Sequence, residues 1–248
     1  MSISRCISLA SREKREGEVD GEIYFFKTKE EIKKKQKNKE LLQYIEFNNE
    51  IYGYEKSEFK DIDELIVLIG GSGTGKDTVY DYIKENMKEN FQNQNVKILF
   101  SIPETIKIFD EYAKKHGIKI KKLYIDVEEK ERFKRIIYPK LKQLLKENIK
   151  KEDIELNNLY KTNNIKIKIK DKIITMKDEL YKDIIKTTQD RIKRDGEVFT
   201  KGVKKIKNKY NIKIIKATDL TIAETAEKII KDNENFKEIK QSSKPHLV

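Results

Sequence analysis

The chain has 248 residues, of which 37% are hydrophobic and 40% charged, and its single cysteine excludes an internal disulfide and a cysteine-based zinc cluster. No run approaches the roughly 20 apolar residues of a membrane helix, and Arg5, Arg12 and Lys14 interrupt the N-terminus before a signal-peptide core can form. We therefore expect a soluble cytoplasmic protein. The net charge of +12 suits an anionic ligand, but lysines spread through an Ile-, Asn- and Lys-rich chain are more typical of a solvated surface.

The first sixty residues predict a small unit of mixed strands and helix. Residues 4–10 predict a short strand that leads into a polar segment. A charged helix is expected at residues 29–38, because Thr28 followed by Glu31 forms a capping-box pattern. Residues 41–47 alternate like a second strand, so the unit is predicted to be α+β.

A different pattern begins at residues 65–69, where a continuous apolar run predicts a strand buried on both faces. Further strands of this kind are expected at residues 96–102, 122–127 and 212–217, separated by helical patterns. Alternating strands and helices predict a parallel sheet covered on both faces. Counting residues 4–10, we expect an α/β fold with a five-stranded parallel sheet.

The loop after residues 65–69 matches the Walker A pattern Gly-x4-Gly-Lys, between a buried strand and a helix as that motif requires. Backbone N–H groups and the helix N-terminus can surround phosphate oxygens, and Lys76 can neutralise the β and γ phosphates of ATP. The position after this lysine usually holds Ser or Thr for magnesium, so Asp77 and Thr78 are both candidate Mg²⁺ ligands here. The predicted ATP-binding residues are Gly70, Gly71, Ser72, Gly73, Thr74, Gly75, Lys76, Asp77 and Thr78.

Residues 8–26 resemble the nucleotide-binding signature of guanylate kinases, with Arg12 and Arg15 three apart, a Gly-Glu-Val-Asp-Gly run and an aromatic residue. Residues 40–44 and 51–53 are similar to the rest of that family's GMP-binding unit. The resemblance implies a P-loop core, a GMP-binding subdomain and a lid. Carried over by position, it implies GMP-binding roles for Ser8, Arg12, Arg15, Tyr24, Gln43, Tyr52 and Gly53. Paired guanidiniums and tyrosine hydroxyls suit a phosphate independently, although either cluster alone also suits a solvated basic turn.

Three features depart from the family pattern. The GMP-binding unit precedes the phosphate loop here, whereas the family has the reverse order. Gln43 stands where the family has a glutamate, so the two neighbouring N–H groups of guanine meet one acceptor and one donor. Tyr54 replaces a small hydroxyl residue, and Glu104 is the one acidic residue near the position where the family has an acid after the third core strand.

Arginine is scarce beside lysine, so two pairs at helical spacing are informative: Arg132 with Arg135, and Arg191 with Arg194. The resemblance implies lid arginines in these two regions, and phosphoryl transfer benefits from arginine near the moving charge. The expected catalytic residues are Lys76, Arg135, Arg191 and Arg194, with a surface salt bridge as the equal alternative for each arginine.

The predicted domains are a core edge strand with the start of the acceptor site (1–20), an NMP-binding subdomain (21–60), a P-loop core (61–136), a lid-type insertion ending in a two-stranded ribbon (137–176), a lid helix with C-terminal core (177–234) and a tail (235–248). The expected function is an ATP-dependent kinase of GMP or dGMP that uses Mg²⁺. The alternatives are a kinase of another (deoxy)nucleotide or phosphosugar, and an inactive guanylate-kinase-like interaction module. Small nucleotides are the expected partners, without membrane and without nucleic acid, since the lysine ribbon lacks interleaved aromatics.

Overall fold

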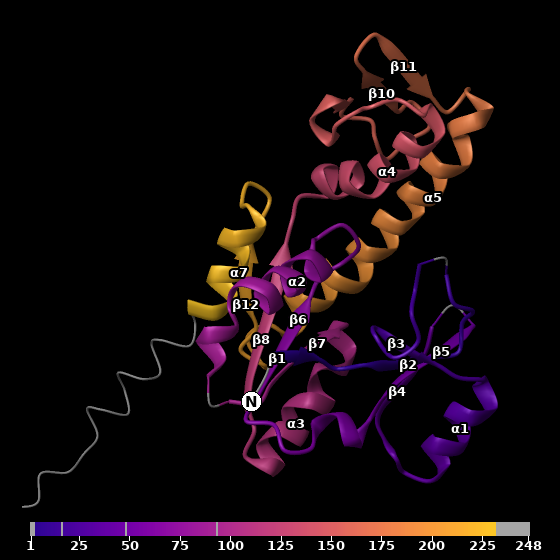
Figure 1. The fold of residues 1–248 in the computed structure, drawn as a ribbon. Coiled ribbons are helices and arrows are strands. Elements are labelled where there is room, and N and C mark those ends of the chain that lie inside the picture. The colour runs from indigo at the N-terminus through magenta and orange to yellow at the C-terminus, as the bar shows by residue number, and fades with distance from the viewer. Residues whose placement is uncertain (1–2, 16, 48, 93, 232–248) are drawn as a thin grey trace, which may run out of the picture.

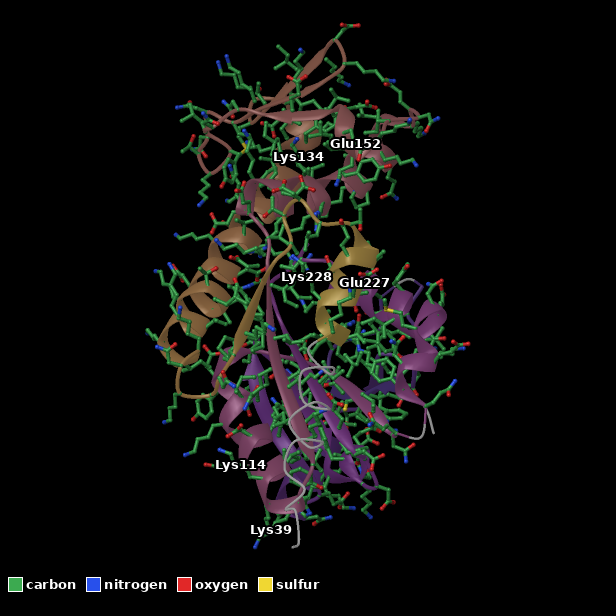
Figure 2. The ribbon with its side chains drawn as sticks, turned by 90° about the vertical axis from the view of Figure 1, so that its left-hand side faces the viewer. Lys39, Lys114, Lys134, Glu152, Glu227 and Lys228 are labelled. Atoms are coloured by element: carbon green, nitrogen blue, oxygen red, sulfur yellow. The ribbon has the colours of Figure 1, made fainter. Side chains whose placement is uncertain are left out.

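Three groups of elements surround a central parallel sheet (Figure 1). The computed structural model describes residues 3–15, 17–47, 49–92 and 94–231, so the expected tail at 235–248 lies outside the described residues. Within these ranges no helix combines the length and apolar character that a membrane crossing requires. Figure 2 shows lysines such as Lys39 and Lys114 at the outer surface, where much of the positive charge is solvated.

The central sheet confirms the predicted five parallel strands. Its order is β1-β7-β6-β8-β12. The bounds are β1 (Ile3–Arg5), β6 (Glu64–Ile69), β7 (Val96–Ser101), β8 (Lys119–Asp126) and β12 (Lys213–Lys216). Strand β6 lies in the middle and is buried along its whole length, which explains the unbroken apolar run that predicted it.

Helices cover both faces of this sheet. Ile66 and Leu68 pack in one core cluster with α2 (Lys76–Asn86) and α7 (Ile222–Lys231). The alternate residues of β6 pack with α3 (Ile106–His116) and α6 (Gly202–Ile206). Successive side chains of a strand point to opposite faces, so one strand supplies both cores.

A second sheet has the order β3-β2-β5-β4, with β2 (Ser8–Ala10), β3 (Tyr24–Phe26), β4 (Leu41–Phe47) and β5 (Glu50–Glu55). Helix α1 (Lys29–Lys37) packs on it and begins with the predicted Thr28–Glu31 capping box. The single strand predicted at residues 4–10 is wrong. Cys6 still donates its N–H to Ile98 of the core sheet, but the Ile7 N–H turns to Glu58 Oε2 at 3.0 Å. The chain therefore leaves the first sheet as β1 and enters the second as β2.

The third region consists of α4 (Glu129–Leu145), α5 (Glu179–Asp195) and a small antiparallel sheet of β9 (Ile154–Leu156), β10 (Lys166–Ile169) and β11 (Lys172–Thr175). The predicted two-stranded ribbon is thus a hairpin with a third strand, β9, paired to β10. Ile165, Ile167, Ile169 and Ile174 of this hairpin region are buried in one cluster with residues of α4 and α5, whereas Ile173 and the lysines of β10 and β11 are exposed. Helix α4 is continuous past residue 137, so the expected start of the insertion falls inside one helix.

Short helical turns complete the chain. The 3-10 turns are η1 (Lys56–Phe59), η2 (Lys88–Phe91), η3 (Pro103–Thr105) and η4 (Lys151–Asp153), and a π-helical turn η5 (Gly196–Lys201) joins α5 to α6. The phosphate loop follows β6, and η3 follows β7. Because parallel strands end at the same edge of a sheet, both connections lie at the edge where ligands of such sheets bind.

Candidate functional site

A cavity of about 960 Å³ lies where the central sheet, the second sheet and helices α4 and α5 meet. Arg12, Arg15, Tyr24 and Tyr52 line it from the second-sheet side. The loop from Gly70 to Lys76 lines it from the core, and Arg135, Arg191 and Arg194 line it from α4 and α5. Both predicted anion-binding clusters therefore face one cleft, although the chain encodes them in transposed order.

Arg12 is held in place by Glu18. Its Nη1 donates to Glu18 Oε2 at 2.7 Å and its Nη2 donates to Oε1, and the guanidinium lies 4.8 Å from the Tyr24 ring centroid. The hydrogen bond from Arg12 lowers the pKa of Glu18 to about 2. Sequence reasoning listed Arg12 and missed the role of Glu18, although it lies in the Gly-Glu-Val-Asp-Gly run that carried the resemblance.

Arg15 supplies positive charge without such compensation. Its guanidinium donates no hydrogen bond within the described part of the chain, and it lies close enough to Arg191 of α5 to help lower the pKa of that arginine. Burial is the larger cause of the lowered Arg191 pKa, and Asp195 opposes it. Tyr24 and Tyr52 lie beside this charge, with ring centroids 6.2 Å apart. The cluster is suited to a dianionic phosphate.

Ser8, Gln43 and Tyr54 also line the cavity from the strands of the second sheet. Gly53, which the resemblance assigned to GMP binding, is not among the residues that line the cavity. It accepts a hydrogen bond from Ser8 Oγ at 3.1 Å through its carbonyl oxygen. A Cβ at this position would approach the Gln43 carbonyl oxygen to 2.7 Å, so glycine is required by the close contact of β4 and β5.

The phosphate loop folds back on its own lysine. Lys76 Nζ donates to the carbonyl oxygens of Gly70 and Gly71, the latter at 3.0 Å, and burial lowers the pKa of Lys76 to about 8. Gly73 and Gly75 have φ of +75° and +86°, a left-handed conformation that other residues rarely adopt. Thr74 is buried behind the cavity wall and donates to Gly71 O at 2.9 Å, so it holds the loop from behind.

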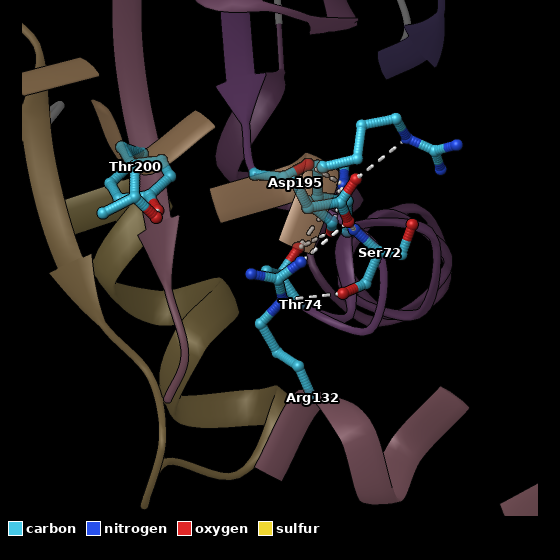
Figure 3. A network of polar contacts seen from close by, with 10 residues as sticks. Ser72, Thr74, Arg132, Asp195 and Thr200 are labelled. Atoms are coloured by element: carbon cyan, nitrogen blue, oxygen red, sulfur yellow. Dashed lines mark hydrogen bonds and ion pairs between the residues drawn. The ribbon is translucent and has the colours of Figure 1, made fainter. Parts of the chain in front are cut away.

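Figure 3 shows how α4 and α5 support this loop. Arg132 is buried; its Nε donates to Ser72 O at 2.8 Å and its Nη2 to Asp195 Oδ2 at 2.7 Å. The same carboxylate oxygen accepts the Ser72 N–H at 2.6 Å. A Cβ on Gly71 would approach Arg132 Nη2 to 2.3 Å, so this glycine makes room for the pair. Sequence reasoning preferred Arg135 and did not assign Arg132 this supporting role; the helical spacing of the two arginines was the signal.

The predicted metal ligands do not both reach the cleft. Asp77 lines it, but its Oδ1 accepts a hydrogen bond from Arg5 Nη1 at 2.7 Å, and Arg5 also stacks 3.9 Å over the Phe100 ring. Thr78 is exposed and is not among the lining residues, so the structure does not bring it to the cleft wall. The reason is the helical turn, which rotates position 78 away from the loop. In residues 3–15, 17–47, 49–92 and 94–231, no three His, Cys, Asp or Glu side chains gather as a metal site.

The arginines of α4 and α5 differ in their partners. Arg135 Nε donates to Glu131 Oε1 at 2.9 Å, and Arg194 lies 4.0 Å from Asp195 and 5.6 Å from the Phe47 ring centroid. Arg191 forms no hydrogen bond or ion pair with the described residues. The salt-bridge alternative thus has direct contacts for Arg135 and Arg194, while Arg191 faces the cleft with its charge unpaired.

Comparison with known proteins agrees with this arrangement at its N-terminal end. Residues 2–65 match the family model for guanylate kinase. The chain is 49% identical over 47 residues to a guanylate kinase of Oceanobacillus iheyensis, covering 19% of this chain and 23% of that protein. It is 33% identical over 106 residues to one of Mesomycoplasma hyopneumoniae, covering 42% and 52%.

The aligned portions are short relative to the matched proteins, since the chain spans between about a quarter and a half of the length of these curated relatives. A solved guanylate kinase of Anaplasma phagocytophilum aligns with 95% of this chain and 76% of its own, at a TM-score of 0.41 and 15% identity. The N-terminal part of the chain is thus similar in sequence to guanylate kinases, with the family-model match confined to residues 2–65.

Proposed function

We propose that this protein is an ATP-dependent nucleoside-monophosphate kinase that transfers the γ-phosphoryl group of ATP to GMP or dGMP. The observation that carries the proposal is the shared cleft, in which an arginine and tyrosine cluster faces a Walker A loop. Phosphoryl transfer needs little covalent chemistry from the protein, so positioning and charge stabilisation are the main requirements. The cleft supplies groups for both positioning and charge stabilisation. ATP and the nucleoside monophosphate are the proposed partners, and the cytoplasm is the proposed location.

In the proposed reaction an oxygen of the acceptor phosphate attacks the γ-phosphorus, and the bond to the β–γ bridging oxygen breaks to release ADP. Arg12, oriented by Glu18, and Arg15 hold the acceptor phosphate together with Tyr24 and Tyr52. When ATP binds, Lys76 Nζ leaves the carbonyl oxygens of Gly70 and Gly71 and donates hydrogen bonds to the β- and γ-phosphate oxygens instead. The charge that spreads over the moving group is met by Arg191 and Arg135, which border the same cavity.

Magnesium fits this cleft as a companion of the triphosphate. Mg²⁺ usually binds one or two carboxylates together with substrate phosphates and water. Asp77 is the residue that would hold it, since the second carboxylate oxygen is free of the hydrogen bond to Arg5. Bound there, the ion would neutralise charge on the nucleotide.

An interaction module without catalysis is the second class of function to consider. A binding module has no need of a phosphate-loop lysine with a lowered pKa, and the supported loop around Lys76 favours the enzyme. A kinase that phosphorylates an acceptor other than GMP is the other alternative, because Gln43 and Tyr54 line the part of the cleft where the base would bind.

Transfer of labelled phosphate from ATP to GMP by the purified protein tests the proposal. Lys76→Ala should reduce turnover about 10³-fold, a typical loss when a charge-stabilising group is removed from a transition state. Lys84→Ala, an exposed lysine on the same helix, is the matched control and should keep full turnover. A folded protein that labels none of the natural nucleoside monophosphates, or unchanged activity in Lys76→Ala, contradicts the kinase.

A further inference from the structure

The side chain of Gln43 is buried in the acceptor wall, yet its amide is uncommitted. The residue is 4% exposed and lines the cleft from β4. A register shift between Leu41 and Gln43 interrupts the β4–β5 ladder at this point. Such irregularities re-aim side chains and are common beside active sites. Within the described residues the Gln43 amide forms no hydrogen bond, and it is not among the fully enclosed polar atoms that lack a partner, so the amide is open to the cleft.

The neighbouring hydroxyl groups are already engaged. Ser8 Oγ donates to the carbonyl oxygens of Leu9 and Gly53, at 3.0 and 3.1 Å. Tyr54 OH donates to Phe100 O at 3.1 Å and is so enclosed that burial raises its pKa. The hydroxyl protons of Ser8 and Tyr54 are therefore donated to backbone carbonyl oxygens, whereas the Gln43 amide of the same wall forms no hydrogen bond within the described residues.

An amide presents one acceptor and two donors side by side, and it can be turned over about its last torsion. Facing guanine or hypoxanthine, Oε1 accepts from N1–H while Nε2 donates to O6. Turned over, Oε1 accepts from the adenine amino group while Nε2 donates to N1. Each purine receives two hydrogen bonds. A carboxylate, which only accepts, pairs with N1–H and N2–H of guanine and offers nothing to adenine N1.

We infer that the acceptor pocket takes purine nucleoside monophosphates as a class, with GMP, IMP and AMP read by a reversible Gln43 amide. The inference rests on the proposed kinase function and deepens it. Guanine leaves its N2 amino group unpaired by this residue, so IMP should perform as well as GMP. Pyrimidines place their hydrogen-bonding edge one ring closer to the ribose, so they should fall short of the amide.

Turnover and binding of each monophosphate test the inference. We expect kcat/KM for GMP, IMP and AMP to agree within about tenfold, the range that one unpaired group controls, and CMP and UMP to be slower still. Calorimetric titration without ATP should give the same order of affinity. No transfer to any nucleotide defeats the kinase proposal, whereas transfer to GMP with IMP and AMP more than about 100-fold poorer overturns this inference alone.

Two substitutions of Gln43 sharpen the result. Gln43→Glu should raise the GMP to AMP ratio of kcat/KM by about 100-fold, because guanine exchanges two neutral hydrogen bonds for two to a charged carboxylate, while adenine loses one. Gln43→Met keeps the volume and removes both hydrogen-bonding groups, so it should weaken the binding of all three purines alike, by about tenfold. Unchanged purine binding in Gln43→Met overturns the inference, and its melting temperature verifies folding.

A control addresses the carboxylate of Glu104, which lines the cleft from η3. If Gln43 reads the base, Glu104→Gln leaves the GMP to IMP ratio within about twofold. If Glu104→Gln changes the GMP to IMP ratio of kcat/KM more than Gln43→Glu does, Glu104 is the residue that recognises the base, and the inference is overturned.

Discussion

The two regions of the cleft that we propose to bind phosphate are built from different parts of the polypeptide. On the acceptor side, side chains of Arg12, Arg15, Tyr24 and Tyr52 converge, and a carboxylate fixes one guanidinium. On the donor side the backbone itself forms the cradle, and its shape depends on glycines in left-handed conformations. One side is therefore defined by residue chemistry and the other by main-chain geometry.

This difference decides what each region requires from the rest of the fold. The acceptor cluster needs local partners, and Glu18 lies six residues from Arg12. The donor loop needs distant ones, because Arg132 and Asp195 approach Ser72 from α4 and α5. Removing the local partner Glu18 should therefore affect mainly the binding of the acceptor. Removing the distant partners Arg132 or Asp195 should affect mainly the stability of the donor loop.

The largest effect is expected for Asp195→Asn. It leaves the buried Arg132 without its negative partner, which typically costs about 3–5 kcal/mol. Urea denaturation of the free protein should show a lowered midpoint with an unchanged slope. Asp190→Asn, an exposed site on the same helix, is the control. Equal stability of the two variants would show that the loop does not depend on this pair.

A smaller effect is expected for Glu18→Gln. Loss of a charge-assisted pair that orients Arg12 should raise the KM of the monophosphate about tenfold and leave the KM of ATP unchanged. Steady-state kinetics with each substrate varied separately measures this split. Glu13→Gln makes the same change of charge in the same segment and should have little effect. A lower KM in Glu18→Gln would instead mean that Glu18 competes with the phosphate.

The pH dependence should also differ between the two regions. Lys76 has a pKa lowered to about 8, so ATP affinity should fall by up to about tenfold per unit as the pH rises above 8. Because the pKa of Lys76 is lower in the folded protein than in the unfolded chain, the charged lysine lowers the free energy of unfolding below pH 8. This destabilisation disappears as the pH rises from 8 towards the unfolded pKa of 10.5. Glu18, with a pKa of about 2, favours folding above its unfolded pKa of 4.5 and loses this effect as the pH falls towards 2.

Calorimetric titration of ATP between pH 7 and 10 measures the response of Lys76. Lys76→Arg keeps its charge over this range and should flatten the profile. A profile that is equally steep in Lys76→Arg would assign the titration to another group.

The smallest effect is expected at the exposed Arg5–Asp77 pair, which links β1 to the first turn of α2. Asp77 is 65% exposed, so a coupling of about 0.5 kcal/mol within the pair is typical, which is a two- to threefold departure from additivity in the KM of ATP, whatever the single change at Asp77 does to Mg²⁺ binding. A double-mutant cycle of Arg5→Gln and Asp77→Asn measures it. Strictly additive effects would show that the pair does not connect the two segments.

Local patterns predicted the elements with strong periodicity. The apolar run of β6, the Thr28–Glu31 cap of α1 and the Walker A glycines each appear in the structure at the predicted place. The break between β1 and β2 was missed because three-residue strands carry too little pattern to show a change of sheet. The position of Thr78 outside the cavity lining could not be seen from residue type, because helix phase decides which position faces the loop.

The sequence by itself determined the chemistry of the parts: a phosphate loop, an arginine and tyrosine cluster and five strands for a parallel sheet. Only the tertiary structure decided that β1 pairs with β7 beside β6, so that segments in transposed order border one cavity. It also decided that Arg132 supports the loop and that Arg5 holds Asp77. These contacts join residues 60 to 123 positions apart, and such pairings depend on sheet order and helix packing, which leave no local signature in the chain.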